Sequence, residues 1–225
     1  GLVVFLWITD KDMHMVYKYT TDGQRLMALG KRGIAGDSQS RDAFNGPADV
    51  AIAPNGDFFV ADGDYGSRVV HFSKDGEFIK VIGGTKGSGP GEFDVPHAVA
   101  LDSQGRLLVA DEQPTSDKPR IQVFHQDGTF IEQWADIGLS LPTGLAVGPD
   151  GTVYVGDSRG NAIHVIRDGE VVEVIGSLQG RPHAITIDPE TSVLYFADPP
   201  SDIRINGPED ELPPGGFVKQ VIPKH

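Results

Sequence analysis

One stretch of sequence occurs four times in this chain, and it limits the possible folds more than any other feature. The copies are GPADVAIAPNGDFFVAD, VPHAVALDSQGRLLVAD, LPTGLAVGPDGTVYVGD and RPHAITIDPETSVLYFAD. They open at Pro47, Pro96, Pro142 and Pro182 and close at Asp62, Asp111, Asp157 and Asp198. The spacing between proline and aspartate is 15 residues in three copies and 16 in the fourth. A fifth copy, VVFLWITD, ends at Asp10 and lacks the opening half.

The repeat predicts four antiparallel strands in each copy. Alternating apolar residues, such as Val50 and Ile52, predict a first strand. A turn such as PNGD leads to a second strand that ends in the aspartate. A third strand follows (MVYKYT, RVVHFS, RIQVFH or AIHVIR), and a DG turn leads to a fourth (RLMALG, EFIKVIG, TFIEQWA or EVVEVIG). Four strands in a repeat of about 40–50 residues are typical of a β-propeller blade, and blades stack in a ring to bury their faces.

We therefore expect an all-β fold in which residues 1–225 form a single β-propeller domain with about five visible blades. The first blade lacks its first strand, and the last ends with GGFVKQVIP as a third strand. This gives roughly eighteen strands where six full blades need about 24. The chain is thus expected to be truncated at its N-terminus relative to a six-bladed ring, or to close with five blades. An open blade edge would favour self-association.

Composition restricts the partners. Nineteen Lys and Arg against 32 Asp and Glu give a net charge of −13, which repels phosphate backbones and argues against nucleic acid. The chain has no cysteine, which excludes disulfides and thiolate chemistry. No apolar run approaches the roughly 20 residues of a membrane-spanning helix. The N-terminal GLVVFLWITD lacks a basic leader and predicts a buried strand rather than a signal peptide.

Several stretches resemble NHL-repeat propellers of the six-bladed class, and among these the peptidyl-α-hydroxyglycine α-amidating lyases. The stretches are ITDKDMHMVYKY, FNGPADVAI, DGDYGSRVVHFSKDGEFI, FDVPHAVAL and RIQVF. The resemblance covers residues 7–131 well and the last two repeats more loosely. It implies a secreted or periplasmic protein with a peptide or small-molecule substrate in the central channel.

Histidine follows the repeat proline at His97 and His183, where the other copies have Ala48 and Thr143. His14 precedes the third strand of the incomplete first copy. Since the first and third strands of a blade start from one face of the ring, we expect these histidines at one mouth of the channel. They come from alternate blades, about 120° apart in a six-fold ring. Three imidazoles suit Zn²⁺ with an open fourth position, and the resemblance implies zinc here. The alternative is that each histidine only caps or packs.

The resemblance also implies a tyrosine general base in a DGY turn, with arginines that hold the substrate carboxylate. Here the turn is DGDYGSR, so Asp64 stands at the tyrosine position and Tyr65 follows it. Tyr65 or Asp64 is the candidate base, and Arg68 is a candidate for orienting the substrate. Glu112 stands where the family has an arginine, which predicts weaker carboxylate binding.

Other positions favour structural roles. Lys118 and Arg120 are candidates to replace the lost arginine. Arg120 stands at the same repeat position as Arg68, and these two arginines are also predicted to pair with a neighbouring aspartate. Ala184 stands where the family has the aspartate of a structural Ca²⁺, which weakens the case for calcium. The closing aspartates recur in every copy and predict hydrogen bonds to turn amides. Structural, packing or solvent-facing roles are predicted for His71, His125, His164, Trp7 and Trp134, and an irregular loop is predicted over residues 199–216.

Three functions stay open. The first is a zinc-dependent lyase that cleaves peptidyl-α-hydroxyglycine to a peptide amide and glyoxylate, although the changed tyrosine and arginine positions weigh against it. The second is a non-enzymatic NHL propeller that acts as a protein or peptide interaction module. The third is another metal-dependent hydrolase, such as a lactonase, although the carboxylate and Asn cluster usual for those enzymes is not evident.

Overall fold

The computed structural model describes residues 4–113, 118–176, 180–197 and 220–222. Within these ranges the chain forms eighteen strands in five antiparallel sheets, as the repeat predicts. The chain divides into two compact units, Gly1–Asp136 and Ile137–His225, and each is described by itself. No helix in the described part of the chain has the length and apolar character of a membrane span.

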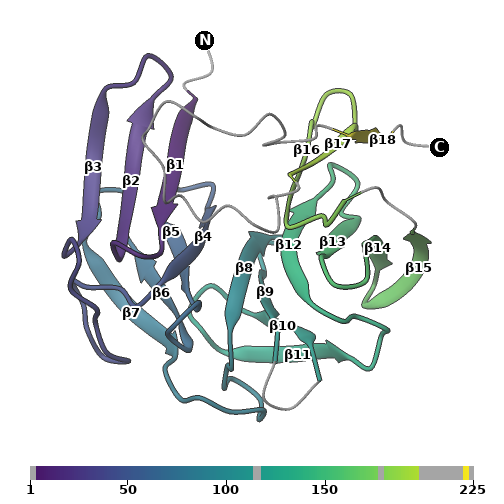
Figure 1. Cartoon of the computed structure of the whole chain (residues 1–225), viewed down its shortest axis with the longest axis horizontal. Helices are drawn as coiled ribbons and strands as arrows, with labels where there is room; N and C mark the ends of the chain where they lie inside the picture. The colour runs from purple at the N-terminus through teal and green to yellow at the C-terminus, as the bar shows by residue number, and fades with distance from the viewer. Residues whose placement is uncertain (1–3, 114–117, 177–179, 198–219, 223–225) are drawn as a thin grey trace, which may run out of the picture. The chain divides into compact units, whose positions relative to one another are not determined.

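The first unit holds three sheets (Figure 1). The first sheet contains β1 (Phe5–Asp10), β2 (Met15–Thr20) and β3 (Arg25–Gly30) in that order. The second sheet contains β4 (Pro47–Ile52), β5 (Phe58–Asp62), β6 (Arg68–Phe72) and β7 (Phe78–Gly83). The third sheet contains β8 (Pro96–Leu101), β9 (Leu107–Asp111), β10 (Arg120–Phe124) and β11 (Phe130–Ala135). Each strand pairs with the next along the chain, which is the expected meander.

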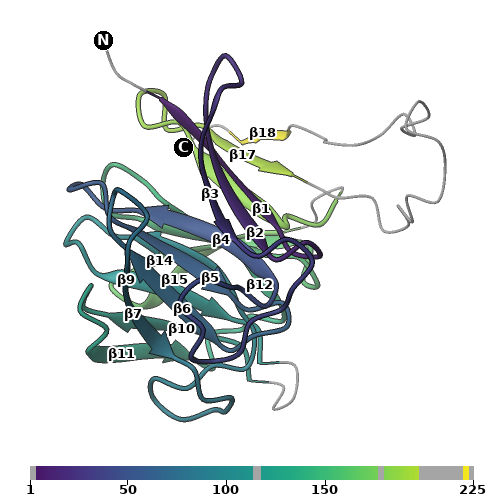
Figure 2. The same ribbon diagram turned by 90° about the vertical axis from the view of Figure 1, so that its left-hand side faces the viewer.

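The second unit holds the fourth and fifth sheets. The fourth contains β12 (Pro142–Val147), β13 (Val153–Asp157), β14 (Ala162–Arg167) and β15 (Glu170–Ile175). The fifth contains β16 (Ala184–Ile187), β17 (Leu194–Ala197) and β18 (Gln220–Ile222), and β17 and β18 run side by side in Figure 2. The predicted strand in GGFVKQVIP is therefore confirmed. A single domain and a five- or six-bladed ring stay predictions. Asp198, His225 and the predicted loop over 199–216 lie outside the described residues.

The cores lie between neighbouring sheets. Successive strand residues point to opposite faces, so Phe58 and Phe59 enter two different clusters, and both are fully buried. Trp7 of the first sheet is partly buried and packs on Phe58 with ring centroids 4.5 Å apart, and Trp134 is buried, as expected for packing residues. His71 stacks on Phe59 at 4.2 Å, which confirms its structural role.

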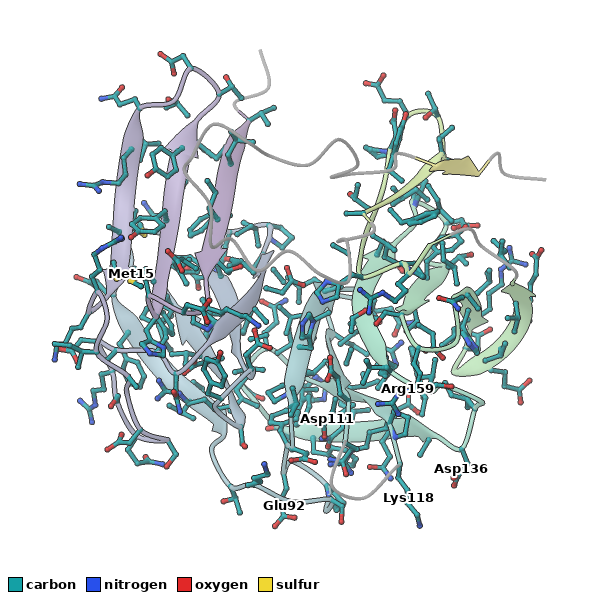
Figure 3. The ribbon with its side chains drawn as sticks, in the orientation of Figure 1. Met15, Glu92, Asp111, Lys118, Asp136 and Arg159 are labelled. Carbon is teal, nitrogen blue, oxygen red and sulfur yellow. The ribbon has the colours of Figure 1, made fainter. Side chains whose placement is uncertain are left out.

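The closing aspartates bind amides of the loop that precedes the repeat proline, as predicted. Asp62 accepts a hydrogen bond from the Asn45 amide at 2.6 Å. Asp111, at the end of β9 (Figure 3), accepts bonds from the amides of Asp94 and Val95 at 2.9 and 3.0 Å. Each carboxylate thus fixes the entry of its own first strand, which positions the loops at this end of each sheet.

Two arginines bind the same aspartates, and each aspartate with its arginine and loop amides is here called a polar anchor. Arg68 Nε donates to Asp62 Oδ2 at 2.8 Å, and its remaining nitrogens donate to backbone carbonyls of the loop before β4. Arg120 pairs with Asp111 at 3.2 Å. Both arginines are buried, so the predicted pairing with a neighbouring aspartate is confirmed.

The fourth sheet uses a histidine in place of the arginine. Asp157 again accepts loop amides, from Ser140 and Leu141 at 2.7 and 2.9 Å. Its partner across the strand pair is Ala162 rather than an arginine. His164, two residues further along β14, places Nε2 3.5 Å from Asp157 Oδ2. The role of His164 is therefore structural, as predicted.

Candidate functional site

His14 lies in the tight turn between β1 and β2. The Met13 amide donates to Asp10 Oδ1 at 3.0 Å, which closes the turn. His14 itself has a φ of 58°, a left-handed conformation that is uncommon outside glycine. Its Nδ1 accepts a hydrogen bond from the Gly46 amide at 3.2 Å. A loop of the second sheet thus holds a ring from the first.

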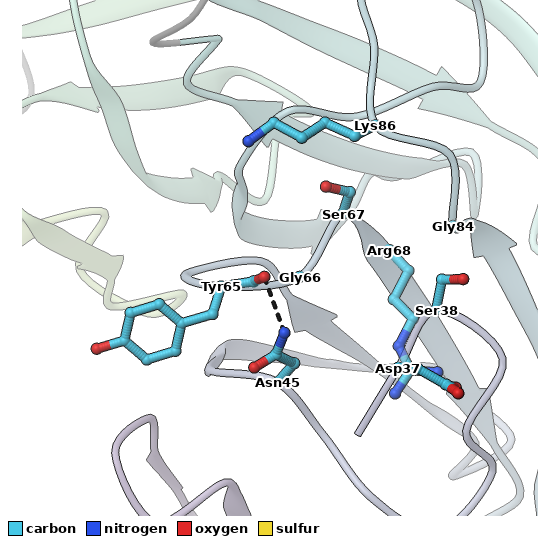
Figure 4. Close-up of a pocket in the computed structure, with 9 residues that line it drawn as sticks. All are labelled: Asp37, Ser38, Asn45, Tyr65, Gly66, Ser67, Arg68, Gly84 and Lys86. Atoms are coloured by element: carbon cyan, nitrogen blue, oxygen red, sulfur yellow. Dashed lines mark hydrogen bonds between the residues drawn. The ribbon is translucent and has the colours of Figure 1, made fainter. Parts of the chain in front are cut away.

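The loop between β5 and β6, here called the Tyr65 turn (residues 63–67), is built against Gly46. The Asp64 amide donates to the Gly46 carbonyl at 3.0 Å. Asn45 and Tyr65 exchange two further bonds, one of which is drawn in Figure 4. A Cβ on Gly46 would lie 2.8 Å from the Tyr65 ring and 2.9 Å from the Asp64 Cβ. Glycine is therefore required where this loop and the Tyr65 turn meet.

The Tyr65 side chain leaves this turn toward the first sheet. Its hydroxyl donates to Asp12 Oδ1 at 3.1 Å, and its ring lies edge-on to His14 with centroids 6.3 Å apart. The hydrogen bond to Asp12, together with partial burial, raises the pKa of the Tyr65 phenol. Asp64 Oδ2 lies 3.9 Å from Lys11 Nζ. The phenol is therefore held in its protonated form, which disfavours it as a general base.

His97 lies on β8 beside an acidic side chain. Its Nε2 is 4.0 Å from Glu112 Oε1, and both side chains are largely buried. The Glu112 amide donates to the Val95 carbonyl at 3.0 Å, which fixes this residue next to the start of β8. A carboxylate thus stands close to His97 where the resemblance implies an arginine, and it would repel a substrate carboxylate.

A cavity of about 200 Å³ lies beside the Tyr65 turn (Figure 4). Tyr65, Asn45, Ser67 and Lys86 are among the residues that line it. Arg68 also borders the cavity but is only 1% exposed, and its guanidinium already binds Asp62. This geometry favours a structural role for Arg68 over substrate binding.

The structure brings together only part of the predicted site. His14, Asp64 and Tyr65 meet around Gly46, and His97 lies in the same unit on the third sheet. His183 belongs to the second unit, where its amide donates to the Ala197 carbonyl at 3.1 Å. The convergence of three histidines therefore stays a prediction.

The donor groups of the first unit do not fit zinc as they are arranged. No group of three or more His, Asp or Glu side chains among the described residues is placed to hold a metal. Since His14 Nδ1 accepts a bond from the Gly46 amide, the neutral ring carries its proton on Nε2. Zinc needs an unprotonated nitrogen, so His14 would have to reorient and lose that bond. Zinc and calcium remain predictions from the resemblance.

Sequence reasoning missed two residues of this site, Asp12 and Lys86. Asp12 is 53 positions from Tyr65 in sequence, and its only signal is the charged run DKD in the first turn. Lys86 places Nζ 2.9 Å from Asp94 Oδ1, and nothing in the repeat pattern marks it.

The chain is similar to known NHL-repeat proteins. The NHL repeat family model matches residues 44–72 and 139–166. The chain is 32% identical over 211 residues to NHL repeat-containing protein 3 of Homo sapiens, covering 86% of the chain and 59% of that protein. It is 29% identical over 234 residues to peptidyl-alpha-hydroxyglycine alpha-amidating lyase 1 of Drosophila melanogaster, covering 97% and 41%. The chain thus spans less than two thirds of the length of these relatives.

Solved structures share the fold. A chain in the crystal structure of a nidogen/laminin complex matches with a TM-score of 0.67 at 21% identity, over 86% of this chain and 67% of that one. A streptogramin B lyase structure matches with a TM-score of 0.59 at 19% identity, over 87% and 59%. At these identities the similarity establishes the fold alone.

Proposed function

Because this chain is an NHL-repeat protein of propeller-like fold, related to the amidating lyases and to NHL repeat-containing protein 3, we propose that it binds polypeptides at the Tyr65 turn and does not act as a lyase. The observation that carries this proposal is the hydrogen bond from the Tyr65 phenol to Asp12. In this hydrogen bond the phenol, which is the candidate general base, donates its proton to a carboxylate of the protein itself.

The surroundings of Tyr65 support binding. The side chain is 55% exposed and stands at the edge of the 200 Å³ cavity, which also presents Asn45, Ser67 and Lys86. Exposed tyrosines beside a small polar cavity are typical contacts in protein interfaces, because the ring supplies area and the hydroxyl a hydrogen bond. A cavity of this size accommodates one side chain of a bound segment.

The same surroundings weigh against catalysis. A general base works best with a pKa near the working pH, and the pKa of Tyr65 is raised above its usual value of 10.0. Glu112 next to His97 adds a negative charge where the substrate of the amidating lyases carries its own carboxylate. Both effects oppose binding and turnover of a hydroxyglycine peptide.

Selection of displayed peptides on the immobilised chain tests this function. A selected peptide should bind the chain in solution by calorimetry, and Tyr65→Ala should weaken it about tenfold or more. Val174→Ala, a change at an exposed position on β15 of the second unit, should leave its affinity unchanged. Peptides that bind equally well to Tyr65→Ala would contradict the proposed site.

Catalysis is the second candidate. It is favoured by the 29% identity to an amidating lyase in an alignment that covers 97% of the chain. It is also favoured by His14, His97 and His183, which stand at the positions the resemblance gives to zinc. If bound, zinc would supply Lewis-acid chemistry at a substrate hydroxyl. Mass spectrometry of protein purified without added metal tests this candidate. Less than about 0.2 zinc per chain, unchanged in His97→Ala, would reject it.

A further inference from the structure

Asparagine precedes glycine at residues 45–46 and 55–56 of the described chain, and at residues 206–207 outside it. In such a pair the glycine nitrogen can attack the side-chain carbonyl carbon of the asparagine, because glycine has no Cβ in the way. The attack closes a cyclic imide and releases ammonia. It requires that the glycine nitrogen lose its proton, so the partner of that N–H group decides how readily the pair reacts.

The Gly46 amide donates to a base. Its partner is His14 Nδ1 at 3.2 Å, and this nitrogen carries a lone pair in the neutral ring. The Gly56 amide donates instead to the Ala53 carbonyl at 2.8 Å, which does not take up a proton at neutral pH. Of the two described pairs, therefore, only the one at residues 45–46 has a general base in contact with the reacting nitrogen.

Asn45 is held beside this amide and borders the cavity. Its backbone amide donates to Asp62 at 2.6 Å, and its side-chain Nδ2 donates to the Tyr65 carbonyl at 2.9 Å (Figure 4). These bonds restrict the rotation that ring closure needs, so the reaction depends on the base to offset this restraint. Asn45 also lines the cavity of about 200 Å³, which is large enough to admit the water that opens an imide.

We propose that Asn45 and Gly46 form a self-modification site at which His14 is the general base. His14 Nδ1 takes the Gly46 amide proton, and the Gly46 nitrogen bonds to Asn45 Cγ. The bond from Cγ to Nδ2 breaks, and Nδ2 leaves as ammonia with that proton. Water then adds to either carbonyl of the imide and returns a proton to the nitrogen, which leaves aspartate or isoaspartate at position 45.

The modification alters the Tyr65 turn. Nδ2 of Asn45 is the donor to the Tyr65 carbonyl, and the carboxylate that replaces it cannot donate. Isoaspartate also adds a methylene group to the main chain next to Gly46, where even a Cβ would lie within 3 Å of Tyr65 and Asp64. The reaction thus loosens the turn as the protein ages, whatever the turn binds.

Peptide mapping by mass spectrometry of the folded chain, incubated at neutral pH with a chelator that keeps metal off His14, tests this proposal. His14→Asn is the matched variant. Asparagine tolerates the φ of 58° at this position, and its side-chain carbonyl can accept the Gly46 amide without acting as a base. The parent should convert Asn45 at least about tenfold faster than the variant. Conversion of Asn55 should be the same in both, which also shows that the variant is folded.

Three results would overturn the proposal. The first is an equal rate at Asn45 in the parent and in His14→Asn. The second is an Asn45 that stays intact in the parent while Asn55 converts. The third is a difference between parent and variant that persists in urea, since unfolding removes His14 from Gly46 and should make the rates equal. If His14→Asn unfolds, His14→Gln replaces it. No peptide ligand enters the measurement, so its outcome is independent of the proposed function.

Discussion

Asp62 and Arg68 form an ion pair that is shielded from solvent, with Nε 2.8 Å from Oδ2. Asp111 and Arg120 repeat this pair in the third sheet at 3.2 Å. Each pair joins the end of a second strand to the start of a third and holds the loop before the repeat proline. The repeat therefore specifies a polar anchor as well as a strand pattern, and the loops of the candidate site rest on it.

Replacing Arg68 with alanine should lower the free energy of unfolding by about 3–5 kcal/mol, because the buried Asp62 would lose its partner and two loop carbonyls would lose their donors. Urea denaturation measures this loss. Lys74→Ala, which removes an exposed pair with Asp75, should change stability by less than about 0.5 kcal/mol. Similar effects of the two substitutions would contradict the structural role of the buried pair.

Asp157 should make the free energy of unfolding depend on pH in the acidic range. Burial by itself would raise the pKa of Asp157, but hydrogen bonds from His164 and from the amides of Gly160, Ser140 and Leu141 outweigh it and lower the pKa to about 2. The folded-state pKa is below the ordinary 3.8, so this stabilisation is complete above about pH 4 and is lost as the pH falls toward 2.

The shift corresponds to about 2 kcal/mol at neutral pH. Denaturation of the parent and of Asp157→Asn at several pH values should show a gap that is widest near pH 7 and narrows below pH 4. A gap that stays constant down to about pH 2.5 would be inconsistent with this pKa.

Asp12→Asn should lower the pKa of Tyr65 toward 10.0, because the hydrogen bond to the Asp12 carboxylate is the main cause of its raised value. Titration of tyrosines labelled with ¹³C at the ring carbon next to the hydroxyl resolves this residue by NMR. Asp22→Asn, in the turn between β2 and β3, is the control and should leave the Tyr65 titration unchanged. An unchanged titration in Asp12→Asn would show that the contact is not formed in solution.

Gly46→Ala should disrupt the Tyr65 turn. A Cβ there would lie within 3 Å of both Tyr65 and Asp64, and φ is +84°. Gly23→Ala is a matched control, since φ is +87° and nothing lies within 4 Å. The control should cost about 1 kcal/mol from backbone strain alone, and Gly46→Ala should cost roughly 2–3 kcal/mol. Equal costs in denaturant would show that the turn tolerates the extra carbon.

The strands and their anchors follow from sequence because their pattern is local and repeated. Alternation, turn residues and the closing aspartates predict the sheets. Arg68 and Arg120 stand at the same position of the repeat, which predicts that each pairs with the closing aspartate of its own sheet. The bond between Tyr65 and Asp12 joins turns of two different sheets, so it depends on how the sheets pack and on exact turn geometry. The pairing of His164 with Asp157 escapes the pattern because the partner of the aspartate lies two residues further along β14.

We propose that the altered turn at Asp64 and Tyr65, together with Glu112, leaves this scaffold without lyase activity. The most direct test measures glyoxylate released from a peptidyl-α-hydroxyglycine by the chain incubated with Zn²⁺. We predict release no faster than from the substrate alone. Turnover well above that rate, lost in His97→Ala, would contradict the claim and restore catalysis as the function.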